Sequence, residues 1–205
     1  MDQRTQERVR RLNYDHHRRM VELHQQWIDR GELAHIEKVD DLSYRTLLQA
    51  IPKNRMAILE LGSSEGKQFP LLAEWLAPGG VLHGIDLYEP NVRAAQASGL
   101  HIELGFVEDM RVYPAASFDL VCSRHVLEHL GDIDDGISEI MRVTRPGGFV
   151  ANVTPDLQAD NEPAHLNRLD LQKWTDVWLS AGLRLKSARR HPFHGGEVHV
   201  VGYVI

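Results

Sequence analysis

A glycine-bounded turn preceded by a carboxylate is the stretch of this sequence best suited to bind a polar ligand. The apolar run 57–61, which includes Glu60, is predicted to be a strand and leads into the turn 62–66 (Gly-Ser-Ser-Glu-Gly). A helix is predicted to follow at 66–77. A strand, a small-residue turn and a helix present backbone N–H groups and a helix N-terminus to such a ligand. Because a carboxylate inside an apolar strand needs a partner, Glu60 is suited to amino or hydroxyl groups.

Two further acidic positions follow predicted strands and can join the same site. Asp86 ends the apolar run 81–86, twenty residues after Gly66, where an acid accepts hydrogen bonds from both hydroxyls of a ribose. The segment 107–110 (Val-Glu-Asp-Met) follows the next strand and offers a carboxylate to an exocyclic amine. Ligands of open α/β sheets bind outside the carboxyl ends of strands, so we expect these positions to converge.

The spacing of the glycines argues against a dinucleotide site. The fingerprint Gly-x-Gly-x-x-Gly, counted from Gly62, requires glycine at positions 64 and 67, but the chain has Ser64 and Lys67 there. We therefore interpret the turn as a site for a nucleoside that carries an amino-acid group. A nicotinamide-dependent oxidoreductase is the disfavoured alternative.

The elements that must position these residues alternate between strand and helix. Strands are predicted at 57–61, 81–86, 101–104, 118–122, 148–153, 183–189 and 197–205, and helices at 66–77, 90–98, 124–130, 134–144 and 171–182. This alternation predicts a parallel sheet with helices on both faces. The join at 191–196 is typical of a hairpin, so the last strand is expected to run antiparallel to its neighbour.

Two helices are predicted before this alternation begins. Residues 1–31 form an amphipathic pattern that Gly31 ends, and a second helix is predicted from about Ser43 to Pro52. The first 19 residues carry six arginines against three acidic residues. A solvated helix face is the favoured interpretation, and a basic lid over an anionic substrate is the alternative.

Four segments in this order resemble the class I S-adenosylmethionine-dependent methyltransferases. They are Ile-Leu-Glu-Leu-Gly-Ser-Ser-Glu-Gly (58–66), Gly-Ile-Asp-Leu (84–87), Ser-Phe-Asp-Leu-Val-Cys-Ser-Arg-His-Val-Leu-Glu-His-Leu (117–130) and Glu-Ile-Met-Arg-Val-Thr-Arg-Pro-Gly-Gly (139–148). The resemblance covers 44–205. It implies an α/β, Rossmann-like seven-stranded sheet, mostly parallel with the last strand antiparallel and helices on both faces. Residues 1–43 are then expected to form an N-terminal helical cap or lid.

The resemblance also implies a cofactor, S-adenosyl-L-methionine, with S-adenosyl-L-homocysteine as its product. By position, the methionine part is expected at Glu60, Gly62, Ser63, Ser64 and Gly66, the ribose at Asp86, the adenine at Leu87, and the adenine edge at Glu108, Asp109 and Met110. Ser123, Arg124 and His125 are expected to face the methyl donor. The family usually has glycine where this chain has Ser64.

Three histidines are candidates for the chemistry on the methyl acceptor. Methyl transfer requires an aligned nucleophile and often a base, and histidine is the base best suited to neutral pH. His125 and His129 are four residues apart and are predicted to share a helix face, while His165 lies in the loop after the fifth strand. Each of them also has a structural interpretation as a packed or solvated imidazole.

A divalent metal site is an alternative use of the same residues. His125, Glu128, His129 and His165 are plausible ligands. Some small-RNA and quinone-precursor methyltransferases carry a similar acid/histidine cluster at this position. A second, weaker set is His191, His194, Glu197 and His199.

Composition narrows the class of protein. The chain has 205 residues and a net charge of −6, which disfavours a general nucleic-acid binder. One cysteine, Cys122, excludes an intramolecular disulfide and fits a reducing compartment. The N-terminus is polar, and no apolar run reaches the roughly 20 residues needed to span a bilayer. We expect a cytoplasmic monomer or homodimer that binds neither membrane nor nucleic acid.

These observations together predict methyl transfer to an oxygen or nitrogen of a small molecule. A specialised metabolite or a saccharide-type substrate fits, and Tyr14, Arg18, Arg19 and Trp27 are candidates to line the acceptor pocket under the lid. A regulatory protein that binds S-adenosylmethionine without catalysis is the alternative from another class.

Overall fold

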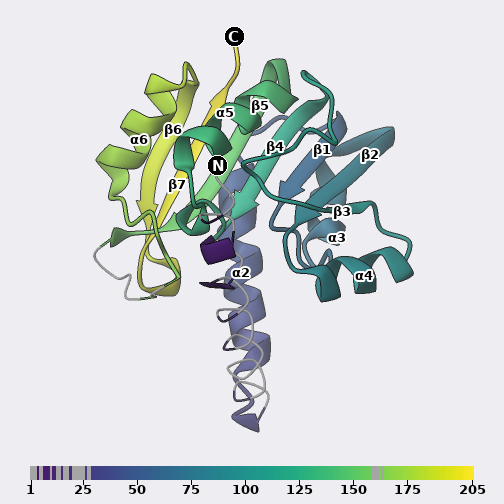
Figure 1. Ribbon diagram of the computed structural model, residues 1–205, viewed down its shortest axis with the longest axis vertical. Helices are drawn as coiled ribbons and strands as arrows, with labels where there is room; N and C mark the ends of the chain where they lie inside the picture. Colours follow the sequence, from purple (N-terminus) through teal and green to yellow (C-terminus); the bar gives the residue numbers. More distant parts are fainter. Residues whose placement is uncertain are drawn as a thin grey trace.

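A seven-stranded sheet in the order β3-β2-β1-β4-β5-β7-β6 forms the middle layer of the molecule (Figure 1). The computed structural model describes residues 4, 7–9, 11, 12, 15, 19, 26, 29–157, 162 and 164–205. The strands are β1 (Arg55–Leu61), β2 (Leu76–Asp86), β3 (Ile102–Leu104), β4 (Phe118–Arg124), β5 (Thr144–Pro155), β6 (Arg184–His191) and β7 (Glu197–Tyr203). β7 runs antiparallel to both β5 and β6, which confirms the predicted hairpin.

Helices cover both faces of the sheet, as the alternation predicted. They are α2 (Leu33–Leu48), α3 (Phe69–Leu72), α4 (Glu89–Ala97), α5 (Ile133–Val143) and α6 (Leu171–Ser180), with 3₁₀ turns η1 (Ala73–Trp75), η2 (Leu127–His129) and η4 (Phe193–Gly195). Successive strand residues point to opposite faces. Accordingly, Ile58 packs in a cluster with α2, α3 and α4, whereas Leu59 packs with α5 and α6.

Three helix predictions need correction. α2 begins at Leu33 rather than near Ser43, and its first turns project from the sheet (Figure 1), where the described side chains of His35, Glu37 and Lys38 are exposed. The helix predicted at 66–77 is limited to α3 and η1, and the chain is already in β2 at Leu76. Only η2 forms in the segment 124–130, since His125 has a left-handed backbone with φ +55° that no right-handed helix accommodates.

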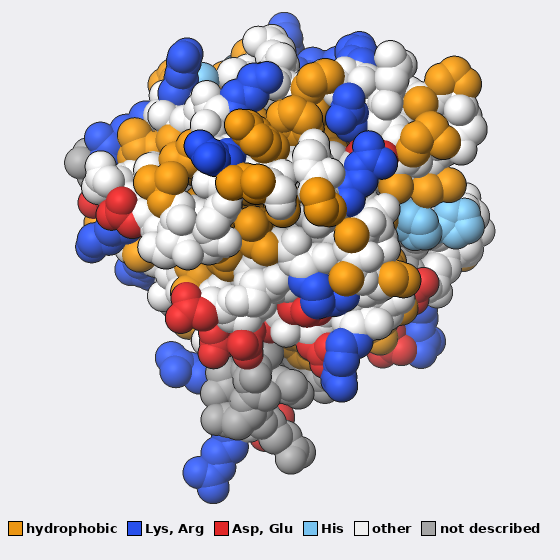
Figure 2. Space-filling model, turned by 90° about the horizontal axis from the view of Figure 1, so that it is seen from above, with side chains coloured by type: hydrophobic (Ala, Val, Ile, Leu, Met, Phe, Trp, Pro, Cys, Tyr) orange, Lys and Arg blue, Asp and Glu red, His pale blue; other side chains and the backbone are white. Residues whose placement is uncertain are grey.

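The carboxyl ends and the amino ends of the parallel strands lie at two opposite edges of the sheet, which have different surroundings. The parallel strands end at the edge that faces α2, and β7 begins at this edge because it runs in the opposite direction (Figure 1). Seen from above, the opposite edge shows hydrophobic side chains among Lys and Arg (Figure 2), and the exposed Met56, Val81 and Tyr203 belong to its strands. Among the described residues, no helix is both long and apolar enough to cross a membrane.

Candidate active site

The turn after β1 is held in a shape that only glycine at position 62 allows. Gly62 has φ +61°, and a Cβ there would lie 2.4 Å from Val126 Cγ2. The backbone N–H groups of Gly62 and Ser63 both donate to Ile85 O, at 2.8 and 3.2 Å. The turn is therefore fixed against the end of β2, and the missing side chain leaves a cradle beside Val126.

Ser64 adopts the conformation that explains why glycine is usual at its position. Its φ is +51°, which costs free energy for any residue with a Cβ. Its backbone N–H donates to Asp86 Oδ2 at 2.8 Å, and its hydroxyl accepts from Asn91 Nδ2 at 2.9 Å. Asp86 also accepts from Tyr88 N at 2.8 Å. Asp86 thus positions the turn in addition to its predicted role at a ribose.

A cavity opens at this edge of the sheet. It is lined by Val9, Gly62, Ser64, Ile85, Asp86, Leu87, Gly105, Val107, Glu108, His125, Val126, His129 and Leu130. The three strand ends singled out in the sequence therefore converge on one pocket. Its lining is mostly apolar with a few polar groups, as is common for small-molecule sites.

Glu60 is a buried carboxylate that fits a positively charged ligand group. It is 4% exposed, and its Oε2 has no hydrogen-bond partner among the described residues. Burial raises the pKa of Glu60 to about 8, although the charge of Arg124 opposes this shift. An ammonium group beside it would supply the missing partner and counter-charge.

At the predicted adenine edge, the structure separates the three candidates. Glu108 is buried, lines the cavity and accepts from Gly131 N at 2.8 Å. Asp109 instead forms a bidentate ion pair with Arg111, with both contacts at 2.6 Å. Met110 is fully buried, and its backbone N–H donates to Glu139. Of these three positions, Glu108 is the one placed to meet a ligand in the cavity.

Five predicted cofactor-binding residues lie close to the cavity without lining it. They are Glu60, Ser63, Gly66, Ser123 and Arg124. Ser123 is buried at the end of β4. Arg124 turns toward α2, where its Nη1 donates to Asp40 Oδ1 at 2.8 Å. Ser123 and Arg124 therefore do not occupy the cavity wall that we expected them to form beside a methyl donor.

His129 lines the cavity as a neutral imidazole with a defined tautomer. Its Nδ1 lies 3.1 Å from Ala164 O, and a carbonyl oxygen only accepts, so Nδ1 carries the proton. The lone pair is then on Nε2. Burial lowers the pKa of His129; nearby Glu128 opposes this and His165 adds to it, so the pKa lies below its usual value. This ring has the protonation state that a general base needs at neutral pH.

His125 lines the same cavity in the opposite charge state. Its Nε2 lies 2.9 Å from Glu197 Oε1, and its Nδ1 lies 3.3 Å from Glu128 Oε1. Burial alone would lower the pKa of His125, but the contacts with Glu128 and Glu197 outweigh it and raise the pKa to about 9. The expectation that His125 and His129 share a helix face is wrong, because the left-handed backbone at His125 directs the two rings to different partners.

The sequence around this pocket matches a known family. Residues 59–152 match the family model described as "Methyltransferase domain". The match, the relatives and the fold support a class I S-adenosylmethionine-dependent methyltransferase. The cofactor of this family is S-adenosylmethionine. Its methionine ammonium group matches the unpartnered Glu60 Oε2, and its adenosine matches the strand ends at Asp86, Leu87 and Glu108.

The individual relatives are distant from this chain in sequence. A ubiquinone biosynthesis O-methyltransferase of Thiobacillus denitrificans is 27% identical over 62% of this chain and 56% of its own length. A nocamycin O-methyltransferase of Saccharothrix syringae is 31% identical over 54% of this chain and 42% of its own length. The chain thus spans about half the length of these curated relatives.

A solved structure shows the same fold. A SAM-dependent methyltransferase from Aquifex aeolicus superposes with a TM-score of 0.65 at 19% identity, covering 84% of this chain and 98% of that one. This likeness covers more of the chain than the family model matches.

His165 approaches His129 from the loop after β5. The two ring centroids are 4.6 Å apart in a T-shaped arrangement. Glu128, His129 and His165 each offer a ligand atom within 4.8 Å of the others, and in the part of the chain that the structure describes they form the one group of three with this geometry. In the alternative set near the C-terminus, His199 contacts Glu197 and His191, whereas His194 pairs with Asp40 outside the set.

The N-terminal segment reaches the cavity at Val9 and contacts the loop before His165 at Arg19. Val9 is 2% exposed and forms part of the cavity wall. Arg19 forms an ion pair with Glu162 in the loop that precedes His165. The other lid candidates, Tyr14, Arg18 and Trp27, lie outside the described residues. The proposed boundary at residue 43 falls inside α2, which continues across it.

Sequence reasoning missed several residues that shape the acceptor end. Asp40 and Ser43 lie one helical turn apart on α2 and face Arg124 and Glu197. Their spacing would have indicated a common face if the helix had been predicted to begin at Leu33. Ala164 contributes only its backbone carbonyl to His129, so its residue type gave no signal. Glu197 was considered only as a weak metal ligand.

Proposed function

We propose that this protein catalyses S-adenosylmethionine-dependent methyl transfer to a small molecule, with His129 as the general base. The observation that carries the proposal is the neutral His129 ring at the cavity, whose Nε2 holds the lone pair because Nδ1 is bonded to Ala164 O. The bound cofactor would supply an electrophilic methyl group. The chain itself must then hold the acceptor in line and remove its proton.

The residues divide this work between the two ends of the cavity. Gly62, Ser64 and Asp86 would hold the methionine and ribose parts through the turn and the carboxylate. His129 Nε2 would take the acceptor proton as the acceptor atom bonds to the methyl carbon and the carbon–sulfur bond breaks. Glu128, 1% exposed, would stabilise the imidazolium that forms. Val9 would help to exclude water.

We favour a hydroxyl oxygen of a small metabolite or saccharide as the acceptor, with nitrogen as the second choice. Both relatives named above are O-methyltransferases. A positioned base also assists the removal of a proton from a hydroxyl acceptor more than from a nitrogen acceptor. The acceptor would enter beside His125 and His129, beneath the N-terminal segment.

An acceptor screen tests the proposal. Purified protein is incubated with S-adenosylmethionine and a library of hydroxylated and amino metabolites, and S-adenosylhomocysteine formation is measured by mass spectrometry. Turnover with a member of the library and its loss in His129→Gln are expected. Calorimetric binding of S-adenosylhomocysteine without turnover in any reaction would instead identify a non-catalytic binding protein.

A metal-assisted variant of the same reaction is a second candidate. It is supported by the geometry of Glu128, His129 and His165, and by the bond from His129 Nδ1 to a carbonyl, which is common for metal-bound histidine. These three residues would hold the ion, which would polarise the acceptor oxygen. Elemental analysis and turnover after chelation decide between the metal-free and the metal-assisted reaction. No bound metal and unchanged turnover would exclude the metal. Activity restored only by a divalent ion would support it.

A further inference from the structure

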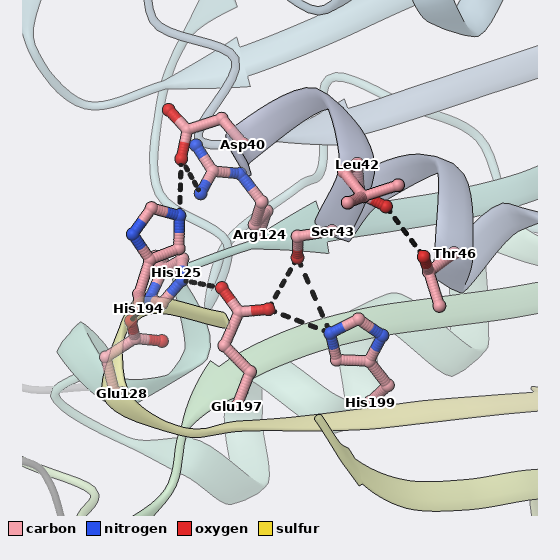
Figure 3. A network of polar contacts seen from close by, with 10 residues as sticks. All are labelled: Asp40, Leu42, Ser43, Thr46, Arg124, His125, Glu128, His194, Glu197 and His199. Carbon is pink, nitrogen blue, oxygen red and sulfur yellow. Dashed lines mark hydrogen bonds and ion pairs between the residues drawn. The ribbon is translucent and has the colours of Figure 1, made fainter. Parts of the chain in front are cut away.

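Glu197 is a fully buried carboxylate that connects three separate segments of the chain. Its Oε1 is 2.9 Å from His125 Nε2, and its Oε2 accepts from Ser43 Oγ at 2.5 Å and lies 2.8 Å from His199 Nε2 (Figure 3). Ser43 belongs to α2, while Glu197 begins β7. The Glu197 side chain therefore links the cavity-lining His125 to Ser43 of α2, which lies 82 positions earlier in the sequence.

Asp40 makes a second connection from the same helix to the same strand end. Its Oδ1 lies 2.8 Å from Arg124 Nη1 and 2.7 Å from His194 Nε2 (Figure 3). Asp40 and Ser43 are three residues apart, so they lie on one face of α2. This face is bonded to Arg124 directly and to His125 through Glu197.

His125 has a backbone conformation that needs support from its surroundings. A φ of +55° is unfavourable for a residue with a Cβ and persists where neighbouring contacts hold it. Its backbone N–H donates to Val153 O at 2.9 Å, and its ring lies between Glu128 and Glu197. The contact with Glu197 is the shorter of the two ring contacts.

We propose that Glu197 is a positioning residue that fixes the His125 ring at the acceptor end of the cavity, and that Ser43 makes α2 part of this arrangement. The inference rests on the proposed methyl transfer and adds to it a residue that touches neither cofactor nor acceptor. On this proposal, Glu197 and Ser43 determine how the acceptor is held, and neither belongs to the strand ends that bind the cofactor. Loss of this support should impair the transfer step and leave cofactor affinity unchanged.

A spectroscopic test needs no acceptor. Ring ¹⁵N resonances of His125, assigned with His125→Asn, are compared in the full chain saturated with S-adenosylhomocysteine. Glu197→Gln should shift both ring resonances, and Ser43→Ala should shift them less. Thr46→Ala is the matched control, because its hydroxyl lies on α2 but bonds only to Leu42 O of the same helix. Unshifted His125 resonances in Glu197→Gln would overturn the proposal.

A kinetic test uses the acceptor found by the screen. Glu197→Gln should lower kcat about 100-fold, as expected when a change away from the reacting atoms misplaces the acceptor by about 1 Å, with the Kd for S-adenosylhomocysteine unchanged. Glu103→Gln, an exposed substitution on β3, should change neither value. A parallel loss of cofactor affinity and turnover in Glu197→Gln would reduce Glu197 to a structural role and refute the proposal. A screen without any acceptor would defeat the proposed function, while the resonance test would still decide this inference.

Discussion

The cofactor end and the acceptor end of the cavity are built in different ways. The cofactor end consists of backbone and short side chains at neighbouring strand ends, exemplified by Gly62, Ser64 and Asp86. The acceptor end consists of two imidazoles: His125 is held by Glu197 of β7, which Ser43 of α2 contacts in turn, and His129 is held by the backbone carbonyl of Ala164. A fold can keep the first end constant through its backbone, whereas the second can change with a few substitutions.

The two neighbouring histidines show what this difference allows. His125 contacts two buried carboxylates and has a raised pKa, while His129 contacts a carbonyl and has a lowered pKa. Two nearby groups whose surroundings give them different pKa values can take different roles in a reaction. Variants at the cofactor end should therefore change affinity, and variants at the acceptor end should change rate alone.

The largest expected effect is at the cofactor end. Gly62→Val should abolish S-adenosylhomocysteine binding in calorimetry, because even its Cβ would lie 2.4 Å from Val126 Cγ2. Gly79→Val is the matched control, since Gly79 also has a positive φ, +78°, but has open space around it. Normal binding by Gly62→Val would show that the ligand does not use this turn.

At the acceptor end, His129→Gln should lower kcat by about a hundred- to ten-thousand-fold, the usual range for a general base. Its affinity for S-adenosylhomocysteine should stay at the wild-type value, measured by the same calorimetry. His101→Gln, an exposed change on a different part of the sheet, serves as the control. Unimpaired turnover in His129→Gln would remove this residue from the mechanism.

A smaller effect is expected from Asp86→Ala. The loss of a charged acceptor for two hydroxyls costs about 1.5–3 kcal/mol, or about 10- to 150-fold in Kd. Asp109→Ala should have no effect on Kd, because Asp109 pairs with Arg111 outside the cavity lining. Equal losses in the two variants would mean that the nucleoside lies differently from the arrangement proposed above.

The smallest effect is a proton released on binding. With a pKa of about 8, Glu60 is mostly protonated at pH 7 in the free protein, and a ligand ammonium group favours its ionised form. Binding of S-adenosylhomocysteine should thus release close to one proton at pH 7 and none well above pH 8. Calorimetry in buffers of different ionisation enthalpy measures this number. Release that persists in Glu60→Gln would contradict the assignment.

Much of the cofactor end could be predicted because its residues follow strands closely in sequence. Of the predicted cofactor-binding residues in this region, Gly62, Ser64 and Asp86 line the cavity, since parallel strands bring their ends together. Arg124 and Asp109 were displaced from their expected places by ion pairs with Asp40 and Arg111. Such pairs join side chains without a periodic pattern, so the sequence did not indicate them.

The sequence by itself determined the sheet and its antiparallel last strand, because periodicity and turn residues are local properties of the chain, and its motifs carried the resemblance to the methyltransferases. Only the tertiary structure decided the charge states of His125 and His129. Those states depend on Glu197, Glu128 and Ala164 O, which reach the two rings from other segments of the fold. Burial and partner distance set a pKa, and neither is defined until the chain has folded.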